Sequence, residues 1–154
     1  RMSDIEPLKP IVCWMSRVSH VGRYPHGARV GYGSTCRLDR KSVIGVIPVG
    51  YGDGYPLGLS NRAVVCLPDL RDGSDHVSCR VLGQVNMDQI VVDLTDVPDP
   101  TPGHLLGTVV ELISDDPTSP CALPVLAEAA HSHCYEMLCR LSSRLYRRYV
   151  TDED

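Results

Sequence analysis

Tyrosines within glycine-rich segments are the residues of this 154-residue chain whose surroundings best suit chemistry. Tyr32 lies in "VGYGST", and Tyr51 and Tyr55 lie in "VIPVGYGDGYP". A phenolic hydroxyl can donate a hydrogen bond, and a suitably placed tyrosine can exchange a proton with a substrate. Glycine weakens a strand, but it lets the backbone approach another group closely. The pattern therefore favours hydroxyl groups held close to a site.

The aromatic composition leaves two interpretations open. The chain has seven tyrosines and no phenylalanine. One interpretation is drift in composition. The other is that some of the phenolic hydroxyls are needed, because a buried tyrosine usually finds a partner for this group.

The "GYGDG" segment superficially resembles a dinucleotide-binding fingerprint, because it follows a predicted strand. That motif requires a helix that opens at once and holds a pyrophosphate at its N-terminus. Pro56, Gly58 and Asn61 follow instead, and the lysine of a phosphate-binding loop is missing. The sequence thus argues against nucleotide binding and predicts a turn or bulge at Asp53-Gly54. Asp53 is expected to be a turn and network residue rather than a base.

Metal and disulfide sites are not supported by the pattern of cysteines and histidines. The seven cysteines are odd in number and include no C-x-x-C pair. Most of them are expected to be small buried apolar residues. His131 and His133 lie close together, but no carboxylate or cysteine completes a known zinc spacing. We therefore predict no metal site and expect these histidines on the exposed side of a helix.

Charge and hydropathy limit the class of protein. The net charge of −4 and the pI near 5.8 argue against a nucleic-acid partner. No apolar run approaches the roughly 20 residues of a membrane helix, and the first ten residues do not form a signal peptide. The chain is therefore expected to be cytoplasmic, with no membrane contact. An apolar content of 43% can build a core for one domain over residues 1–154.

Short strands separated by turn clusters dominate the predicted elements. Strands are expected over about 10–118, with "SVIGVIPVG" as a buried run rich in β-branched residues. Helix formers recur at helical spacing over about 119–141, where Pro124 suits a first turn and Ser132 could cap a second segment. This pattern is compatible with one long helix and equally with two short helices. A final strand is expected over about 144–150, and the fold class is mainly β and barrel-like.

Four segments, taken in order, resemble the C-terminal domain of alanine racemase, the pyridoxal-phosphate enzyme that interconverts L- and D-alanine. They are "VGYGST", "IPVGYGDGYP", "GQVNMDQIVVDL" and "LAEAAHSHCYEML", and the resemblance covers about Leu8 to Val150. It implies a mainly-β, barrel-like C-terminal domain with a short helical segment near its end. It also implies an N-terminal α/β barrel that holds pyridoxal 5'-phosphate on a lysine. The family works as a head-to-tail homodimer, in which this domain completes the active site of the other subunit.

The resemblance also implies roles for five residues. Tyr32 matches the catalytic tyrosine that takes the proton from L-alanine, and Tyr51 matches the tyrosine that narrows the substrate entrance. Met87 matches the position whose backbone N–H binds the substrate carboxylate, and Asp88 lies at the entrance. Tyr135 matches the tyrosine whose hydroxyl holds the cofactor phosphate. The alternatives are ordinary packing: a strand-end tyrosine for Tyr32, core filling for Met87 and a helix tyrosine for Tyr135.

The sequence departs from the family in two respects. Lys9 and Lys41 are the only lysines, and neither lies in a cofactor-lysine motif. The chain alone is therefore expected to be inactive and to bind no cofactor. Leu57 and Gln84 lie at or near positions where many relatives have arginine, which implies a less cationic entrance. The alternative hypothesis is a freestanding β-domain that binds a partner or small molecule without catalysis. Tyr55 is expected to be a packing residue.

Overall fold

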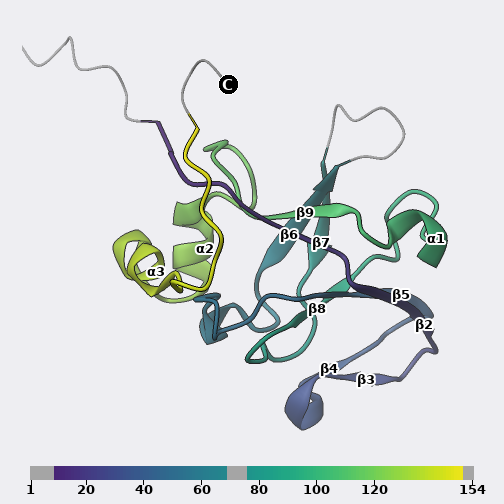
Figure 1. The fold of residues 1–154 in the computed structure, drawn as a ribbon. Helices are drawn as coiled ribbons and strands as arrows, with labels where there is room; N and C mark the ends of the chain where they lie inside the picture. Colours follow the sequence, from purple (N-terminus) through teal and green to yellow (C-terminus); the bar gives the residue numbers. More distant parts are fainter. Residues whose placement is uncertain (1–8, 69–75, 151–154) are drawn as a thin grey trace, which may run out of the picture.

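A computed structural model describes residues 9–68 and 76–150, which form nine strands in three sheets and three short α-helices (Figure 1). The mainly-β class predicted from the sequence is confirmed. No helix within these two ranges has the length and apolar character needed to cross a bilayer.

A four-stranded antiparallel sheet contains the first strand and three later ones. Its order is β1-β9-β6-β7. Glu111 of β9 lies between Met15 of β1 and Cys66 of β6, so these residues share one row across the sheet. The strands are β1 (Trp14–Arg17), β9 (Val109–Ile113), β6 (Val64–Pro68) and β7 (His76–Arg80).

A three-stranded sheet and a two-stranded ribbon complete the β structure. The sheet has the order β2-β5-β8 and consists of β2 (His20–Tyr24), β5 (Ser42–Ile47) and β8 (Ile90–Asp93). The ribbon pairs β3 (Arg29–Val30) with β4 (Cys36–Arg37). Figure 1 shows the ribbon extending away from the two larger sheets.

The two larger sheets meet at both of their edges. On one side β1 runs into β2 across Val18 and Ser19, and the Ser19 N–H donates to the Val46 carbonyl over 2.8 Å. On the other side Val81, directly after β7, pairs with Val92 of β8. The strands thus follow one another around a common core, as expected of a barrel-like domain.

β5 explains how the ribbon is held. Its β-branched residues suit a strand that is buried on both faces. Val43 and Ile47 enter the main core, whereas Ile44 enters a second apolar cluster with Val30, Leu38 and Leu82. Because Val30 and Leu38 flank the turn between β3 and β4, this second cluster fastens the segment that contains Tyr32.

Two short helices, rather than one long helix, form the helical segment near the C-terminus. They are α2 (Leu123–Ala129), with proline in its first turn, and α3 (Cys134–Arg140). His131, with φ of +52°, separates them. His133, not Ser132, occupies the N-cap of α3, and the Ser132 hydroxyl instead binds the Glu136 carboxylate.

One helical turn lies outside the predicted helical region. α1 (Pro102–Leu105) lies within residues 10–118, where only strands and turns were expected. Proline suits the first position of a helix, and the Thr101 carbonyl accepts hydrogen bonds from the His104 and Leu105 N–H groups. Proline and glycine in this segment indicated a turn, and the hydrogen bonds to the Thr101 carbonyl make that turn helical.

The strand expected over residues 144–150 is absent, although all of these residues are described. Tyr146 and Tyr149 are both exposed, so the segment does not bury alternate side chains as a half-buried strand would. It is held instead by specific contacts at its start, where the Ser142 N–H donates to the Asp53 carbonyl over 2.9 Å.

Tyr55 is a core residue, which confirms the interpretation that it packs. Its side chain is only 1% exposed and meets Trp14 edge to face, with ring centroids 6.1 Å apart. Its hydroxyl is buried and has no partner among the described residues. Burial raises the pKa of Tyr55 above its ordinary value, so the group stays neutral.

Replacing Tyr55 by phenylalanine is therefore expected to raise the free energy of unfolding by about 1 kcal/mol, because a buried hydroxyl without a partner is lost. Denaturant unfolding of both proteins measures this difference. Tyr149→Phe, at an exposed position, is the matched control and should leave stability unchanged. A loss of stability in Tyr55→Phe would show that the hydroxyl has a partner.

Candidate functional site

A surface hollow of about 560 Å³ brings together three of the segments singled out in the sequence. It is lined by Tyr32, Tyr51 and residues 84–89. The first comes from the ribbon, the second from the loop after β5, and the third from the turn before β8. Residues more than 50 positions apart in the sequence thus face one space.

Tyr32 is positioned by a close backbone contact. It opens a 3-10 turn, η1 (Tyr32–Ser34), directly after Gly31, which has φ of +74°. A Cβ on Gly31 would lie 3.1 Å from the Gln84 backbone nitrogen, so the glycine lets the ribbon lie against the segment before the 86–88 turn. The Tyr32 side chain is 73% exposed. Its hydroxyl is therefore available to a molecule in the hollow.

Ser60 and Asn61 support this contact and were missed in the sequence. The Asn61 side-chain oxygen accepts a hydrogen bond from the Gly83 N–H over 2.6 Å, and its Nδ2 donates to Thr35 over 3.2 Å. The Ser60 hydroxyl accepts from the Val85 N–H over 3.0 Å. Asn61 has φ of +58°, a conformation that asparagine tolerates, so its occurrence in a loop was the available signal.

The "GYGDG" loop packs directly on the 86–88 turn. The Tyr51 N–H donates to the Asn86 carbonyl over 3.0 Å, and the Gly52 N–H donates to the Met87 carbonyl over 2.9 Å. A Cβ on Gly50 would lie 2.1 Å from the Asn86 carbonyl oxygen. Only glycine fits there, and the contact holds Tyr51 and Met87 at the same hollow.

Asp53 is a turn and network residue, as predicted. Its carboxylate accepts from the Gly50 N–H over 2.9 Å and from Arg144 Nε over 2.8 Å. The same guanidinium donates through Nη2 to Asp88 over 2.7 Å. The hydrogen bonds to Asp53 and Asp88 raise the pKa of Arg144 above its ordinary value, so the side chain stays charged. Arg144 thus ties the loop after β5 to the rim of the hollow.

Arg144 was not recognised in the sequence, where it was assigned to a strand. Its two partners lie 91 and 56 residues away, so no local pattern indicates the contact. The pairing supplies a cation next to Asp88, although Leu57 and Gln84 had implied a less cationic entrance.

The five predicted site residues do not all gather in one place. Tyr32, Tyr51, Met87 and Asp88 line the hollow, whereas Tyr135 does not. Tyr135 lies on α3 and is 84% exposed, which excludes packing into the core of the chain. Met87 is 54% exposed, so core filling does not explain it either.

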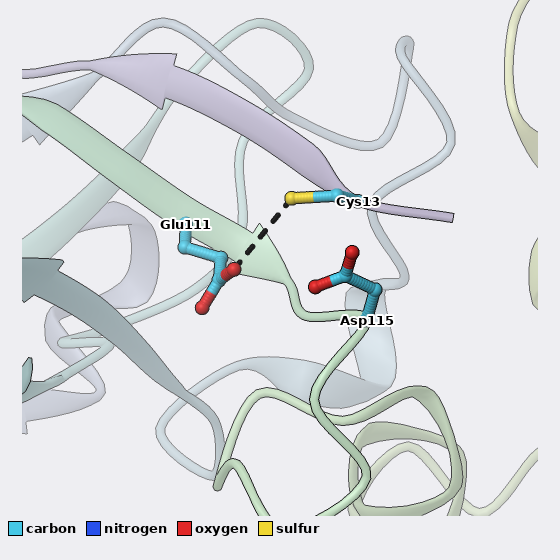
Figure 2. A group of neighbouring side chains, drawn as sticks. All are labelled: Cys13, Glu111 and Asp115. Carbon is cyan, nitrogen blue, oxygen red and sulfur yellow. Dashed lines mark hydrogen bonds between the residues drawn. The ribbon is translucent and has the colours of Figure 1, made fainter. Parts of the chain in front are cut away.

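The groups at the hollow suit hydrogen bonding and proton transfer. They include two phenols, side-chain amides and one carboxylate. Neither Lys9 nor Lys41 lines it. Among the described residues, the one group with metal-ligand character is Cys13, Glu111 and Asp115, whose ligand atoms lie within 4.8 Å of one another (Figure 2). None of these three residues lines the hollow.

Comparison with known proteins places this arrangement in a family. The model of the alanine racemase C-terminal domain matches residues 11–149. The alanine racemase of Halothermothrix orenii is 36% identical over 142 residues, which cover 92% of this chain and 35% of that protein.

Solved structures show the same likeness. Alanine racemase from Streptomyces lavendulae superposes with a TM-score of 0.79 at 28% identity, over 94% of this chain and 35% of that one. The enzyme from Bartonella henselae, solved with covalently bound pyridoxal phosphate, gives a TM-score of 0.75 at 29% identity, over 88% and 34% of the two chains. The chain thus spans about a third of the length of these relatives. With most of its length matched by the family model, the chain belongs to the alanine racemase C-terminal domain family.

Proposed function

We propose that this chain is the C-terminal domain of an enzyme that interconverts L- and D-alanine, and that its hollow completes the active site of a partner subunit. The observation that carries the proposal is the convergence of Tyr32, Tyr51, Met87 and Asp88 on one hollow, in a chain whose relatives are alanine racemases. The full-length protein would be a head-to-tail homodimer with an N-terminal barrel.

Racemisation requires a proton to leave one face of the substrate α-carbon and another to reach the opposite face. When bound, pyridoxal phosphate withdraws the electron pair that the departing proton leaves behind. In this proposal the Tyr32 hydroxyl holds or accepts the proton on the L-face. Its exposure suits a base that acts on a substrate held largely by another polypeptide segment.

The other residues of the hollow orient and enclose the substrate. The Met87 N–H has no acceptor among the described residues, so it is free to donate to the substrate carboxylate. Tyr51 narrows the entrance next to it. Asp88 lies at the rim, where Arg144 fixes its carboxylate. This set favours a small amino acid over a bulky one.

The residues of this chain fit part of a pyridoxal phosphate site. Tyr135 offers an exposed hydroxyl that can donate to the cofactor phosphate, from a position outside the hollow. Neither Lys9 nor Lys41 lines the hollow, and in this proposal the lysine that carries the cofactor belongs to the N-terminal barrel. The chain is therefore suited to complete a cofactor site rather than to form one alone.

Expression of the complete reading frame beside residues 1–154 tests the proposal. The full-length protein is expected to racemise alanine. The 154-residue chain, shown to be folded by circular dichroism, is expected to show no racemisation and to keep no cofactor absorbance after desalting. A full-length protein without racemase activity would instead favour a β-domain that binds a partner or small molecule without catalysis.

A further inference from the structure

Two buried thiols face each other beside β6, on the face of the strand opposite to Val65 and Leu67, which enter the main core. Neither thiol lines the hollow. The sulfur atoms of Cys66 and Cys121 lie 2.9 Å apart, and the two residues are 1% and 0% exposed. A disulfide bond is about 2.05 Å long, so the sulfurs would have to approach by only about 0.9 Å. Neither residue belongs to the proposed active site.

The protein holds both sulfurs in place. Cys66 lies on β6, and Cys121 lies in the segment that links β9 to α2. That segment is tied down by the Cys121 carbonyl, which accepts from the Ser114 N–H over 2.9 Å, and by the Cys121 N–H, which donates to the Ser119 hydroxyl over 3.1 Å. The Cys121 thiol also lies 3.6 Å from the Val64 carbonyl oxygen. The two thiols therefore face each other on a fixed framework.

The surroundings make the two thiols unequal. Hydrogen bonds from the Cys121 thiol and from the Ser119 and Ser78 hydroxyls lower the pKa of Cys66, against the opposing effects of burial and the Glu111 charge. The pKa of Cys121 is raised, because its proton is shared with Cys66 and the group is buried. Cys66 is thus the member that becomes a thiolate first.

We propose that Cys66 and Cys121 form a reversible disulfide when the protein meets a peroxide. The Cys66 thiolate attacks one oxygen of hydrogen peroxide, the O–O bond breaks, and hydroxide leaves to give a sulfenic acid at Cys66. The Cys121 sulfur then attacks the Cys66 sulfur and loses its proton, and the sulfenic oxygen leaves as water. In sum, two thiols and one peroxide give one disulfide and two waters, and a dithiol reductant reverses the change.

The bond would join β6 to the segment that leads into α2. It closes a loop between residues 55 positions apart, which restricts the unfolded chain strongly. The melting temperature of the oxidised protein is therefore expected to rise by about 10 °C.

Two other thiols serve as internal comparisons. Cys13 is exposed, but its sulfur lies 3.6 Å from a Glu111 oxygen and faces Asp115 as well (Figure 2). Partial desolvation of its sulfur and the Glu111 charge raise the pKa of Cys13 to about 11. Cys79 is buried in the core, where burial raises its pKa to about 12. Both stay protonated near neutral pH, so neither should compete with Cys66.

The test is peptide mapping of the native polypeptide after hydrogen peroxide treatment. The treated protein is unfolded in denaturant in the presence of an alkylating reagent, which blocks the free thiols. It is then digested, and the peptides are analysed by mass spectrometry. We expect one peptide pair joined through Cys66 and Cys121, its loss on treatment with dithiothreitol, and the rise in melting temperature. Cys79→Ala and Cys13→Ala should keep the bond, whereas Cys66→Ala and Cys121→Ala should lose it.

The peptide map of the wild-type protein tests the proposed disulfide even if a variant does not fold. Alkylation of both Cys66 and Cys121 after peroxide treatment would overturn the proposal, as would a disulfide from either residue to a different cysteine.

Discussion

Replacing Tyr32 by phenylalanine in the full-length protein is expected to slow alanine racemisation by about 10²–10⁴-fold, which corresponds to about 3–5 kcal/mol in the activation barrier. The substitution removes one hydroxyl and keeps the ring. Because the Tyr32 side chain is largely exposed, the stability of the domain should change little. Steady-state racemisation assays, with thermal unfolding as the control for folding, measure both effects.

Isotope exchange at the α-carbon distinguishes the loss of one catalytic base from a general loss of activity. In the Tyr32→Phe protein, solvent deuterium should still enter the α-position of D-alanine, because the proposed mechanism assigns removal of that proton to the cofactor lysine on the other face. Entry into L-alanine should collapse. Net racemisation must fall equally in both directions, because the enzyme cannot change the equilibrium. Equal exchange losses for the two isomers would contradict the assignment of Tyr32 as the base on the L-face.

Subunit mixing tests whether Tyr32 serves the partner's site. Tyr32→Phe subunits are combined with subunits that lack the cofactor lysine, and heterodimers are isolated. One site then has the lysine of the first subunit and the tyrosine of the second, and it should work. The other site lacks both groups. Verified heterodimers that stay inactive would place Tyr32 outside the partner's active site.

Gly50→Ala is expected to lower the free energy of unfolding by about 3 kcal/mol or more, at the upper end of the usual cost of overpacking. The new methyl group would lie 2.1 Å from the Asn86 carbonyl oxygen and 2.4 Å from that of Met87. Both are backbone atoms, so a rotamer change cannot relieve the clash. The loop or the turn must move, and the hollow loses its shape with it.

Gly103→Ala is the matched control, because nothing lies within 4 Å of a Cβ at that position. It lies in α1, where alanine is the better helix former, and should be neutral or slightly stabilising. Denaturant unfolding of the two variants compares these effects. Equal stability of Gly50→Ala and the wild type would show that the loop after β5 adapts at no cost.

Local patterns predicted the elements of this fold better than the contacts between them. β5 followed from its run of β-branched residues. Helical spacing predicted the helical region near the C-terminus, but it left open whether one long helix or two short ones form there. The strand assigned to residues 144–150 was wrong, because this segment pairs with no strand among the described residues and its tyrosines are exposed. The single turn of α1 was missed, because proline and glycine also mark loops.

The family resemblance singled out four residues that line the hollow, whereas the contacts that support them were not predicted. Tyr32, Tyr51, Met87 and Asp88 meet there because backbone atoms approach closely at Gly31 and Gly50, and glycine-rich motifs do signal such contacts. Arg144 and Asn61 act through side chains that reach across long stretches of sequence. The Cys66–Cys121 pair is of the same kind, since its members are 55 residues apart. Such pairings depend on the completed fold.

The bridge from Arg144 to Asp53 and Asp88 has a consequence for synthesis on the ribosome. Asp53 and Asp88 leave the ribosome well before Arg144 does. The loop after β5 and the rim of the hollow are therefore synthesised before the cation that joins them. A premature stop codon between Asp88 and Arg144 would always remove this bridge. If it fell just before Arg144, the product would retain every tyrosine of the hollow and still lack the residue that fixes its rim.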